Sequence, residues 1–270
     1  MNYGMERIKE FPLSLRLIKE IHEKLMNNSR GGSKQPGEFR TSQNWIGGSR
    51  PGNARFVPPP PDYLMECLGD FEKFLHDETI KIPILVKAAL AHVQFETIHP
   101  FLDGNGRLGR LLITFILCVE GILKEPLLYL SLYLKSNRDD YYNHLQAVRE
   151  KGEWEEWVKF FLKGVIETAK QATETAQSII SLFTRDRAEI ESSGKSTAAV
   201  LTIHTYLQRH PISTTRKIKE NCHLSLPTVL RSLGTLEELR IVKEVTGKDR
   251  HKIFIYEQYL NLLNKGTEPL

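Results

Sequence analysis

Twelve consecutive residues carry most of the reactive chemistry of this chain. They read His99-Pro-Phe-Leu-Asp-Gly-Asn-Gly-Arg-Leu-Gly-Arg110. The apolar runs on either side, Ile82 to Phe95 and Leu108 to Ile122, predict two buried helices. The twelve residues are therefore predicted to form a polar loop between two central helices, extending into the first turns of the second helix.

The glycines and arginines of this loop predict a phosphate site. Gly104 and Gly106 flank the predicted helix start, where unpaired backbone N–H groups and the helix dipole favour anions. Arg107 and Arg110 are three residues apart on a helix, so both can bind further phosphate oxygens from one face.

Two other side chains add a base and a metal ligand. His99 is a candidate general base because the ordinary pKa of histidine lies near neutrality. Asp103 can hold a Mg²⁺ ion that bridges phosphates. Together the loop predicts a site for a nucleotide di- or triphosphate, with a base for the hydroxyl of a second substrate.

Two other nucleotide-site patterns fit poorly. Residues 104–109 match G-x-G-x-x-G, but a helix precedes them, and Glu120 and Glu125 are badly placed for the ribose. The Gly-Lys-Ser run at 194–196 lacks the first glycine of a P-loop, since Glu189 stands there, and it also follows a helix. A helix start with incidental arginines would explain neither His99 nor both glycines.

Composition indicates a soluble, globular protein with room for two domains. The chain has 270 residues, of which 40% are apolar and 26% charged, with a formal charge of +4. Three distant cysteines (Cys67, Cys118 and Cys222) form no C-x-x-C or metal-binding spacing. They favour a reducing, intracellular location, and we expect the cytoplasm. No apolar run is long enough to span a bilayer, and we expect no membrane partner.

The elements that must position the loop are mainly helices. Before them, the runs 39–46 and 54–57 flank a Gly/Pro/Asn tip and predict a small β-hairpin, which Pro58 to Pro61 ends. An ordinary surface hairpin is one interpretation, and a backbone edge open to another extended chain is the other. His92 on a buried helix, and the aromatic stripe of Trp154, Trp157, Phe160 and Phe161, are predicted as core packing.

The C-terminal part predicts a winged helix-turn-helix. Residues 197–209 form a helix, Ser213 and Ser225 are candidate caps of two more, and the β runs 241–245 and 252–256 follow. Between residues 197 and 262 there are ten Lys or Arg against six Asp or Glu. Basic side chains could contact DNA phosphates here: Arg231, Lys248, Arg250, His251 and Lys252. Winged helices also serve in dimerisation and protein docking, so DNA and a homodimer are both open as partners.

The twelve-residue loop is similar, without interruption, to the Fic motif H-P-F-x-[DE]-G-N-G-R-x-x-R. The resemblance extends over about residues 10–165, because the segments 36–40, 44–48 and 56–61 resemble the Fic hairpin flap, and the stretches around Tyr141-Tyr142 and Trp154–Trp157 resemble the region after the motif. It implies a mainly α fold: a helical Fic domain at 1–165, with its flap at about 40–58 and its loop at 99–110. A connecting helix and linker at 166–196 and a winged-helix domain at 197–262 would follow.

The resemblance further implies a protein adenylyltransferase, which moves AMP from ATP to a Ser, Thr or Tyr hydroxyl of a target protein. His99 would deprotonate that hydroxyl, and Asp103 would hold Mg²⁺ across the α- and β-phosphates. Phosphate oxygens would be bound by Gly104, Asn105, Gly106, Arg107 and Arg110, with Arg110 on the γ-phosphate. Asn105 would also fix the loop. The flap would line the nucleotide with Ile46, Gly47, Gly48 and Ser49, and Tyr141 and Tyr142 would lie near the adenine.

One departure from the family pattern concerns control of the site. Many Fic proteins carry an inhibitory helix, [ST]-x-x-x-E-[GN], whose glutamate pairs with the second motif arginine, and this sequence contains no match. Because the chain begins inside a helical pattern, we expect that such a segment lies upstream and is missing, which would leave Arg110 accessible. A nucleotide-sensing, DNA-binding regulator and a Fic enzyme using another nucleotide are the alternative functions. The reverse reaction, de-adenylylation, is disfavoured because it normally needs that glutamate.

Overall fold

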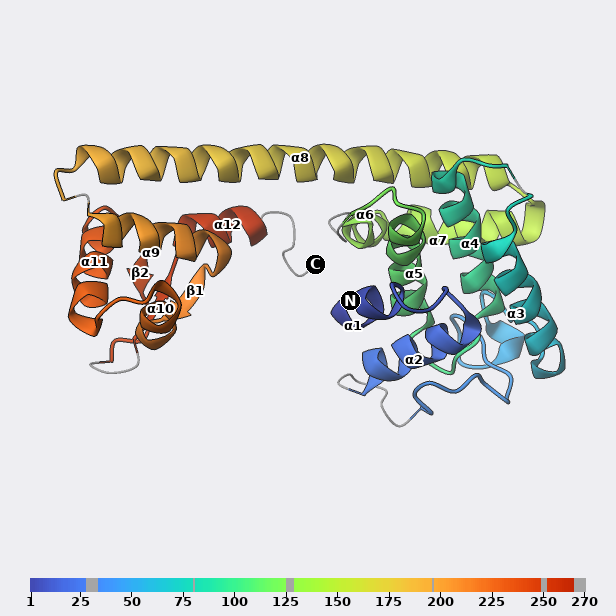
Figure 1. Cartoon of the computed structure of the whole chain (residues 1–270). Helices are drawn as coiled ribbons and strands as arrows, with labels where there is room; N and C mark the ends of the chain where they lie inside the picture. The colour runs from blue at the N-terminus through green and yellow to red at the C-terminus, as the bar shows by residue number, and fades with distance from the viewer. Residues whose placement is uncertain (28–33, 80, 125–128, 196, 249–251, 265–270) are drawn as a thin grey trace. The chain divides into compact units, whose positions relative to one another are not determined.

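The computed structural model describes residues 1–27, 34–79, 81–124, 129–195, 197–248 and 252–264 (Figure 1). The chain divides into two compact units, Met1–Ala169 and Lys170–Leu270. Each unit has its own hydrophobic core. Within the described ranges, no helix is both long and apolar enough to cross a membrane.

The first unit is a set of helices around a central pair. α4 (Ile84–Ile98) packs against α5 (Asn105–Val119), and the loop 99–104 joins them (Figure 1). The other elements are α1 (Asn2–Arg7), α2 (Leu15–Met26), the 3₁₀ turn η1 (Pro51–Asn53), α3 (Pro61–His76), α6 (Leu130–Ser136), α7 (Arg138–Lys151) and the start of α8 (Trp154–Ser192). The prediction of a mainly helical fold is confirmed.

Gly109 of α5 allows the central pair to pack closely, and α4 carries several buried alanines. Ala88, Ala89 and Ala91 of α4 are fully buried. On α5, a Cβ added to Gly109 would lie 3.2 Å from the Phe95 ring and 3.4 Å from the His92 ring. The helices can therefore approach only because position 109 has no side chain.

The predicted hairpin is less regular in the structure than in the sequence analysis. A single antiparallel bridge joins Ile46 to Phe56, with the Ile46 N–H donating to the Phe56 carbonyl over 2.9 Å. Its tip turns through Gly47 and Gly48, whose φ angles are +71° and +70°, and then through η1. The prediction of two β runs is therefore wrong except at this one bridge. The positive-φ glycines and the prolines keep the neighbouring backbone from forming further strand hydrogen bonds.

The second unit combines helices with a three-stranded sheet. Its elements after the end of α8 are α9 (Ala198–Arg209), β1 (Ile212–Thr214), α10 (Thr215–Cys222), α11 (Leu226–Glu238), β2 (Lys243–Glu244), β3 (Ile253–Ile255) and α12 (Glu257–Asn264). The sheet is antiparallel with β3 in the middle, so that Ile255 pairs with both Ile212 and Lys243. Arg250 and His251 lie outside the described residues.

Strand β1 was not predicted from the sequence. Ser213, expected to cap a helix, pairs instead with Phe254, and Thr214 caps α10 by accepting from the Lys217 N–H. Ser225 does cap α11, as predicted. A strand of three residues is too short to give a clear pattern in the local sequence. It forms because it pairs with β3, which lies about 40 residues further along the chain.

Candidate active site

His99 ends α4 in a left-handed conformation, with φ of 50° and ψ of 60°. Its ring Nδ1 lies 3.3 Å from the backbone carbonyl oxygen of Glu96. A carbonyl can only accept, so the neutral ring carries its proton on Nδ1 and keeps the lone pair on Nε2. Burial lowers the pKa of His99 to about 4, so the ring is neutral at pH 7. His99 therefore has the protonation state of a general base.

The loop after His99 is fixed by Asn105. Its side chain accepts from the Phe101 N–H over 2.9 Å and donates to the Phe101 carbonyl over 2.7 Å. Gly104 then turns with φ of +82°, and α5 begins at Asn105. The first N–H groups of α5 lack intrahelical acceptors, and they lie at the end of the loop that His99 opens.

Asp103 lies at the partly exposed edge of the loop. Its Oδ1 accepts from the Gly104 N–H over 2.7 Å and lies 3.9 Å from Nη2 of Arg107. Its side chain is 37% exposed. Magnesium usually takes one or two carboxylates together with substrate phosphates and water, so this donor fits the expected ion. No cluster of three or more acidic, His or Cys side chains that could hold a metal occurs within the described ranges. Any Mg²⁺ here would thus depend on the substrate for further ligands.

The two motif arginines are both partly exposed on the first turns of α5. Arg107 donates to the thioether sulfur of Met26 over 3.1 Å. Arg110 lies over Gly106, where an added Cβ would be 3.3 Å from its Nη1. The missing side chain at 106 therefore leaves room for the Arg110 guanidinium beside the helix start.

His22 of α2 supports the loop and was missed in the sequence analysis. Its Nδ1 accepts from the Gly37 N–H over 2.9 Å, so Nε2 carries the proton and donates to the Asp103 carbonyl over 2.9 Å. The ring is buried and stacks on Phe101 at 3.7 Å. Burial lowers the pKa of His22, which keeps this tautomer neutral. No local pattern marks a histidine 81 residues before its partner.

Arg40 and Asn44 lie in the segments 36–40 and 44–48 that resemble the Fic flap, and both hold the backbone of the loop. The buried Arg40 guanidinium donates to the carbonyls of Ile98 and His99, and also to those of Ser42 and Pro59. Asn44 Nδ2 donates to the His99 and Phe101 carbonyls over 3.2 and 3.0 Å. The base of the flap and the end of α4 are therefore one hydrogen-bonded unit.

Arg149 of α7 makes a second connection between the flap and α4. It donates to the Glu96 carbonyl over 3.0 Å and to Thr97 Oγ1 over 3.2 Å. Its guanidinium lies 4.1 Å from the centre of the Phe56 ring. The side of the flap that follows its tip is thereby held against α7.

The predicted flap residues differ in exposure. Ile46 is half-buried, whereas Gly47, Gly48 and Ser49 are exposed. The Ser49 N–H is used within the tip, where it donates to Asn53 Oδ1 over 3.0 Å. Their contact with a nucleotide stays a prediction.

The two tyrosines are placed differently from one another. Tyr141 is 3% exposed, and its hydroxyl lies 2.9 Å from His92 Nε2. His92 Nδ1 lies 3.0 Å from the Gly109 carbonyl, which confirms His92 as a satisfied core histidine. Tyr142 is half-buried, with its ring centre 5.0 Å from that of Tyr141. Tyr141 thus lies in the interior beneath α5, and the role of either ring beside adenine stays a prediction.

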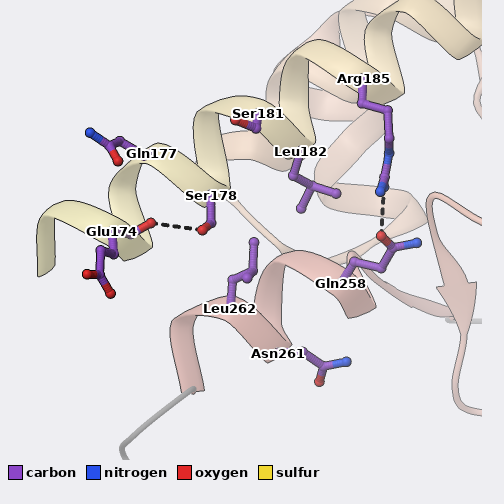
Figure 2. Close-up of a pocket in the computed structure, with 9 residues that line it drawn as sticks. All are labelled: Glu174, Gln177, Ser178, Ser181, Leu182, Arg185, Gln258, Asn261 and Leu262. Carbon is purple, nitrogen blue, oxygen red and sulfur yellow. Dashed lines mark hydrogen bonds between the residues drawn. The ribbon is translucent and has the colours of Figure 1, made fainter. Parts of the chain in front are cut away.

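A separate hollow of about 810 Å³ lies in the second unit, between α8 and α12 (Figure 2). Figure 2 shows Arg185 donating to the side-chain oxygen of Gln258 across it, and Ser178 bonded to the Glu174 carbonyl. Its lining is hydroxyl, amide and leucine side chains with Glu174 and Arg185, and no residue that the sequence analysis selected lies there.

Fold and site together define a helical domain in which a His-to-Arg loop joins two buried helices. Residues 12–117 match the sequence model of the Fic/DOC family. The chain therefore carries a Fic domain in its first unit.

Two curated relatives illustrate the similarity. The chain is 31% identical over 185 residues to protein adenylyltransferase fic-1 of Caenorhabditis elegans, which is 68% of this chain and 32% of that protein. It is 35% identical over 149 residues to protein adenylyltransferase Fic of Aedes aegypti. These residues are 55% of this chain and 27% of that protein. The chain thus spans about a third or less of the length of these relatives.

Solved structures show the same fold. A Fic family protein from Desulfovibrio desulfuricans G20 covers 94% of this chain and 72% of its own, with a TM-score of 0.55 and 19% identity. A Fic domain containing signalling protein from Bacteroides thetaiotaomicron aligns with 66% of this chain over 70% of its own length, with a TM-score of 0.50 and 23% identity.

Proposed function

We propose that this protein is a protein adenylyltransferase, which moves AMP from ATP to a hydroxyl group of a target protein. The observation that carries the proposal is the loop 99–110, in which a neutral imidazole with its lone pair on Nε2 precedes a glycine-rich helix start and two arginines. The adenylyltransferase names of the relatives support ATP as the nucleotide.

In this mechanism Nε2 of His99 takes the proton of a target Ser, Thr or Tyr hydroxyl. The oxygen attacks the α-phosphorus, its new bond to phosphorus forms as the bond to pyrophosphate breaks, and pyrophosphate leaves with the electron pair. Because the pKa of His99 is low, its ring is neutral at pH 7 and can accept the proton of the hydroxyl. The same low pKa makes the ring a weak base, which reduces the driving force for the proton transfer.

The start of α5 binds the phosphates. The N–H groups of Asn105 and Gly106 face oxygen atoms that gain charge during the reaction, and the helix dipole has the matching sign. The Gly104 N–H donates to Asp103 Oδ1 and would join them only by leaving that carboxylate. Arg107 binds inner phosphate oxygens and Arg110 the γ-phosphate. Both are partly exposed, which supports access by a ligand.

Asp103 would hold a Mg²⁺ ion, which neutralises charge on the α- and β-phosphates when bound. The partly exposed carboxylate is already oriented, since Oδ1 accepts from the Gly104 N–H.

The flap receives the target as an extended segment. The exposed Gly47-Gly48 backbone has no side chains to prevent a close approach, and main-chain pairing would set the register of the hydroxyl relative to His99. Because such contacts recognise main-chain atoms, which all proteins share, other surfaces of the protein would have to select the target.

We also propose that residues 197–262 are a winged-helix domain. The order of α9, β1, α10, α11, β2 and β3, with β3 between the other strands, supports this. Exposed Arg231 on α11 and exposed Lys248 after β2 favour a nucleic-acid partner, whereas exposed Leu226 and Leu230 on the same helix favour a protein. The regulator function therefore remains the second candidate.

The test is transfer of label from α-labelled ATP with Mg²⁺, using the protein alone and with a lysate. We expect labelled protein with the unaltered chain, loss of label with His99→Ala, and retained label with His144→Ala, a half-buried histidine on α7 as control. Comparison with CTP, GTP and UTP tests the base. Nucleotide binding without any transfer would overturn the proposal and favour the sensor.

A further inference from the structure

Glu96 is a buried carboxylate within the candidate site that the loop motif does not include. It lies on the last turn of α4, three residues before His99, and is 5% exposed. Its Oε2 is 3.9 Å from His99 Nδ1. The carboxylate is therefore near Nδ1, and not at Nε2, the nitrogen that would accept the target proton.

The other oxygen of this carboxylate faces two motif glycines. Oε1 would be 2.6 Å from a Cβ added to Gly109 and 3.7 Å from one added to Gly106. The same point on Gly106 is 3.3 Å from Nη1 of Arg110. Glu96 thus occupies the space that a side chain at Gly109 would need, and it lies at ordinary contact distance from that of Gly106, against the first turns of α5.

Glu96 Oε1 is buried and makes no hydrogen bond with any of the described residues. A buried acceptor left in this way is unfavourable, because it has lost its hydrogen bonds to water. An apolar side chain of similar size would avoid that cost. A titratable carboxyl group at this place, instead of an apolar side chain, therefore indicates an electrostatic role rather than packing.

The charged and titratable groups near Glu96 come from α4 and its end, from α5 and from α7. His92 lies on α4 and His99 directly after it, Arg110 on α5, and Tyr141 and Arg149 on α7. Burial raises the pKa of Glu96 to about 7, while Arg110 and Arg149 act to lower it. The carboxylate can therefore change charge in the range where the enzyme would work.

We propose that Glu96 is a positioning residue of the transfer reaction that acts through His99: its buried carboxylate lies on the Nδ1 side of the ring and stabilises the imidazolium that forms when His99 accepts the target proton. This inference rests on the proposed function. A negative charge on the Nδ1 side matters only once the ring is positive, so it acts in the transition state and not on bound ATP.

The experiment measures transfer from α-labelled ATP against pH in wild type, Glu96→Gln and Glu96→Asp. Wild-type kcat is expected to rise from pH 6 to 8 with a midpoint near the pKa of Glu96, about 7. Glu96→Gln should lose roughly 10- to 100-fold in kcat at pH 8, part of a general-base contribution. Its KM for ATP should change less than about threefold, and its rate should no longer rise across this range.

Glu96→Asp separates charge from packing, because it keeps the carboxylate on a shorter stem. It should be slower than wild type but keep the rise with pH. Glu66→Gln, an exposed glutamate on α3, is the matched control and should behave as wild type.

The outcomes distinguish the two proposals. If wild type transfers no AMP under any condition, the proposed function fails and this inference fails with it. If wild type transfers AMP and Glu96→Gln keeps the wild-type kcat or the same rise with pH, only the role of Glu96 is overturned. If Glu96→Gln does not fold, Glu96→Asp decides, since a pH-independent rate in that variant also contradicts the proposal.

Discussion

The guanidinium of Arg40 donates a hydrogen bond over 3.0 Å to the carbonyl oxygen of His99, a residue 59 positions further along the chain. His99 needs such support because a left-handed conformation is unfavourable for a residue with a Cβ. Asn44 bonds the same carbonyl. The backbone that carries the imidazole is therefore held by the base of the flap as well as by α4.

Arg40→Gln is expected to reduce both stability and transfer. Removal of the buried guanidinium leaves carbonyls of Ile98, His99 and Pro59 without this donor, so the free energy of unfolding should fall by about 1–3 kcal/mol. Denaturant unfolding and labelling rates measure the two effects. Arg16→Gln, an exposed arginine paired with Glu20, should change stability by less than about 1 kcal/mol. Equal effects of the two substitutions would contradict the role of Arg40.

Gly109→Ala should destabilise the first unit by about 1–3 kcal/mol, because the new methyl group would meet Glu96 Oε1 at 2.6 Å and the Phe95 ring at 3.2 Å. Gly234→Ala is the matched substitution in α11, where an added Cβ meets nothing within 4 Å. It should stabilise its helix by about 0.5–1 kcal/mol. Thermal unfolding of both variants tests the prediction, which fails if Gly109→Ala is as stable as wild type.

The pH dependence of the free energy of unfolding should show that the pKa of Glu96 is raised in the folded protein. Its pKa is about 7 in the folded state against an ordinary value of 4.5, so the folded state holds this proton more tightly. Its contribution is fully present below pH 4.5 and is lost as pH rises through about 7. The free energy of unfolding of wild type should therefore fall relative to that of Glu96→Gln between these pH values. Parallel pH profiles of the two proteins would show that Glu96 titrates normally.

Tyr256→Phe should destabilise the second unit. The Tyr256 hydroxyl donates to Oδ2 of Asp186 over 2.5 Å, and both side chains are buried. Without that donor the carboxylate loses a charge-assisted hydrogen bond, which costs about 1–3 kcal/mol. Tyr259→Phe, a half-buried tyrosine three residues later, is the control and should have a smaller effect on denaturant unfolding.

DNA binding by the second unit can be tested by gel shift at low and high salt. If α11 and the segment after β2 contact DNA, Arg231→Glu and Lys248→Glu should each weaken binding and reduce its salt dependence, because each removes an exposed cation. Arg16→Glu in the first unit should not. Absence of any shift at low salt would remove DNA as a partner and leave the exposed leucines of α11 as a protein-docking surface.

The local sequence was sufficient for the loop and its flanking helices. The apolar runs predicted helices at 82–95 and 108–122, and α4 and α5 occur at Ile84–Ile98 and Asn105–Val119. His99, Asp103 and the glycines could be selected because their chemistry depends on neighbours within twelve residues. Helical periodicity and the unpaired groups of a helix start are local properties, so one sequence is enough to predict them.

Only the tertiary structure decided what holds that loop in place. His22 and Arg40 reach it from α2 and the flap, and Arg149 of α7 holds the end of α4 that precedes it. Glu96 lies in the space that a side chain at Gly109 would need. It also placed Tyr141 in the interior and formed β1 by pairing with a distant strand. The physical reason is that burial and long-range hydrogen bonds depend on which segments meet, and spacing along the chain does not contain that information.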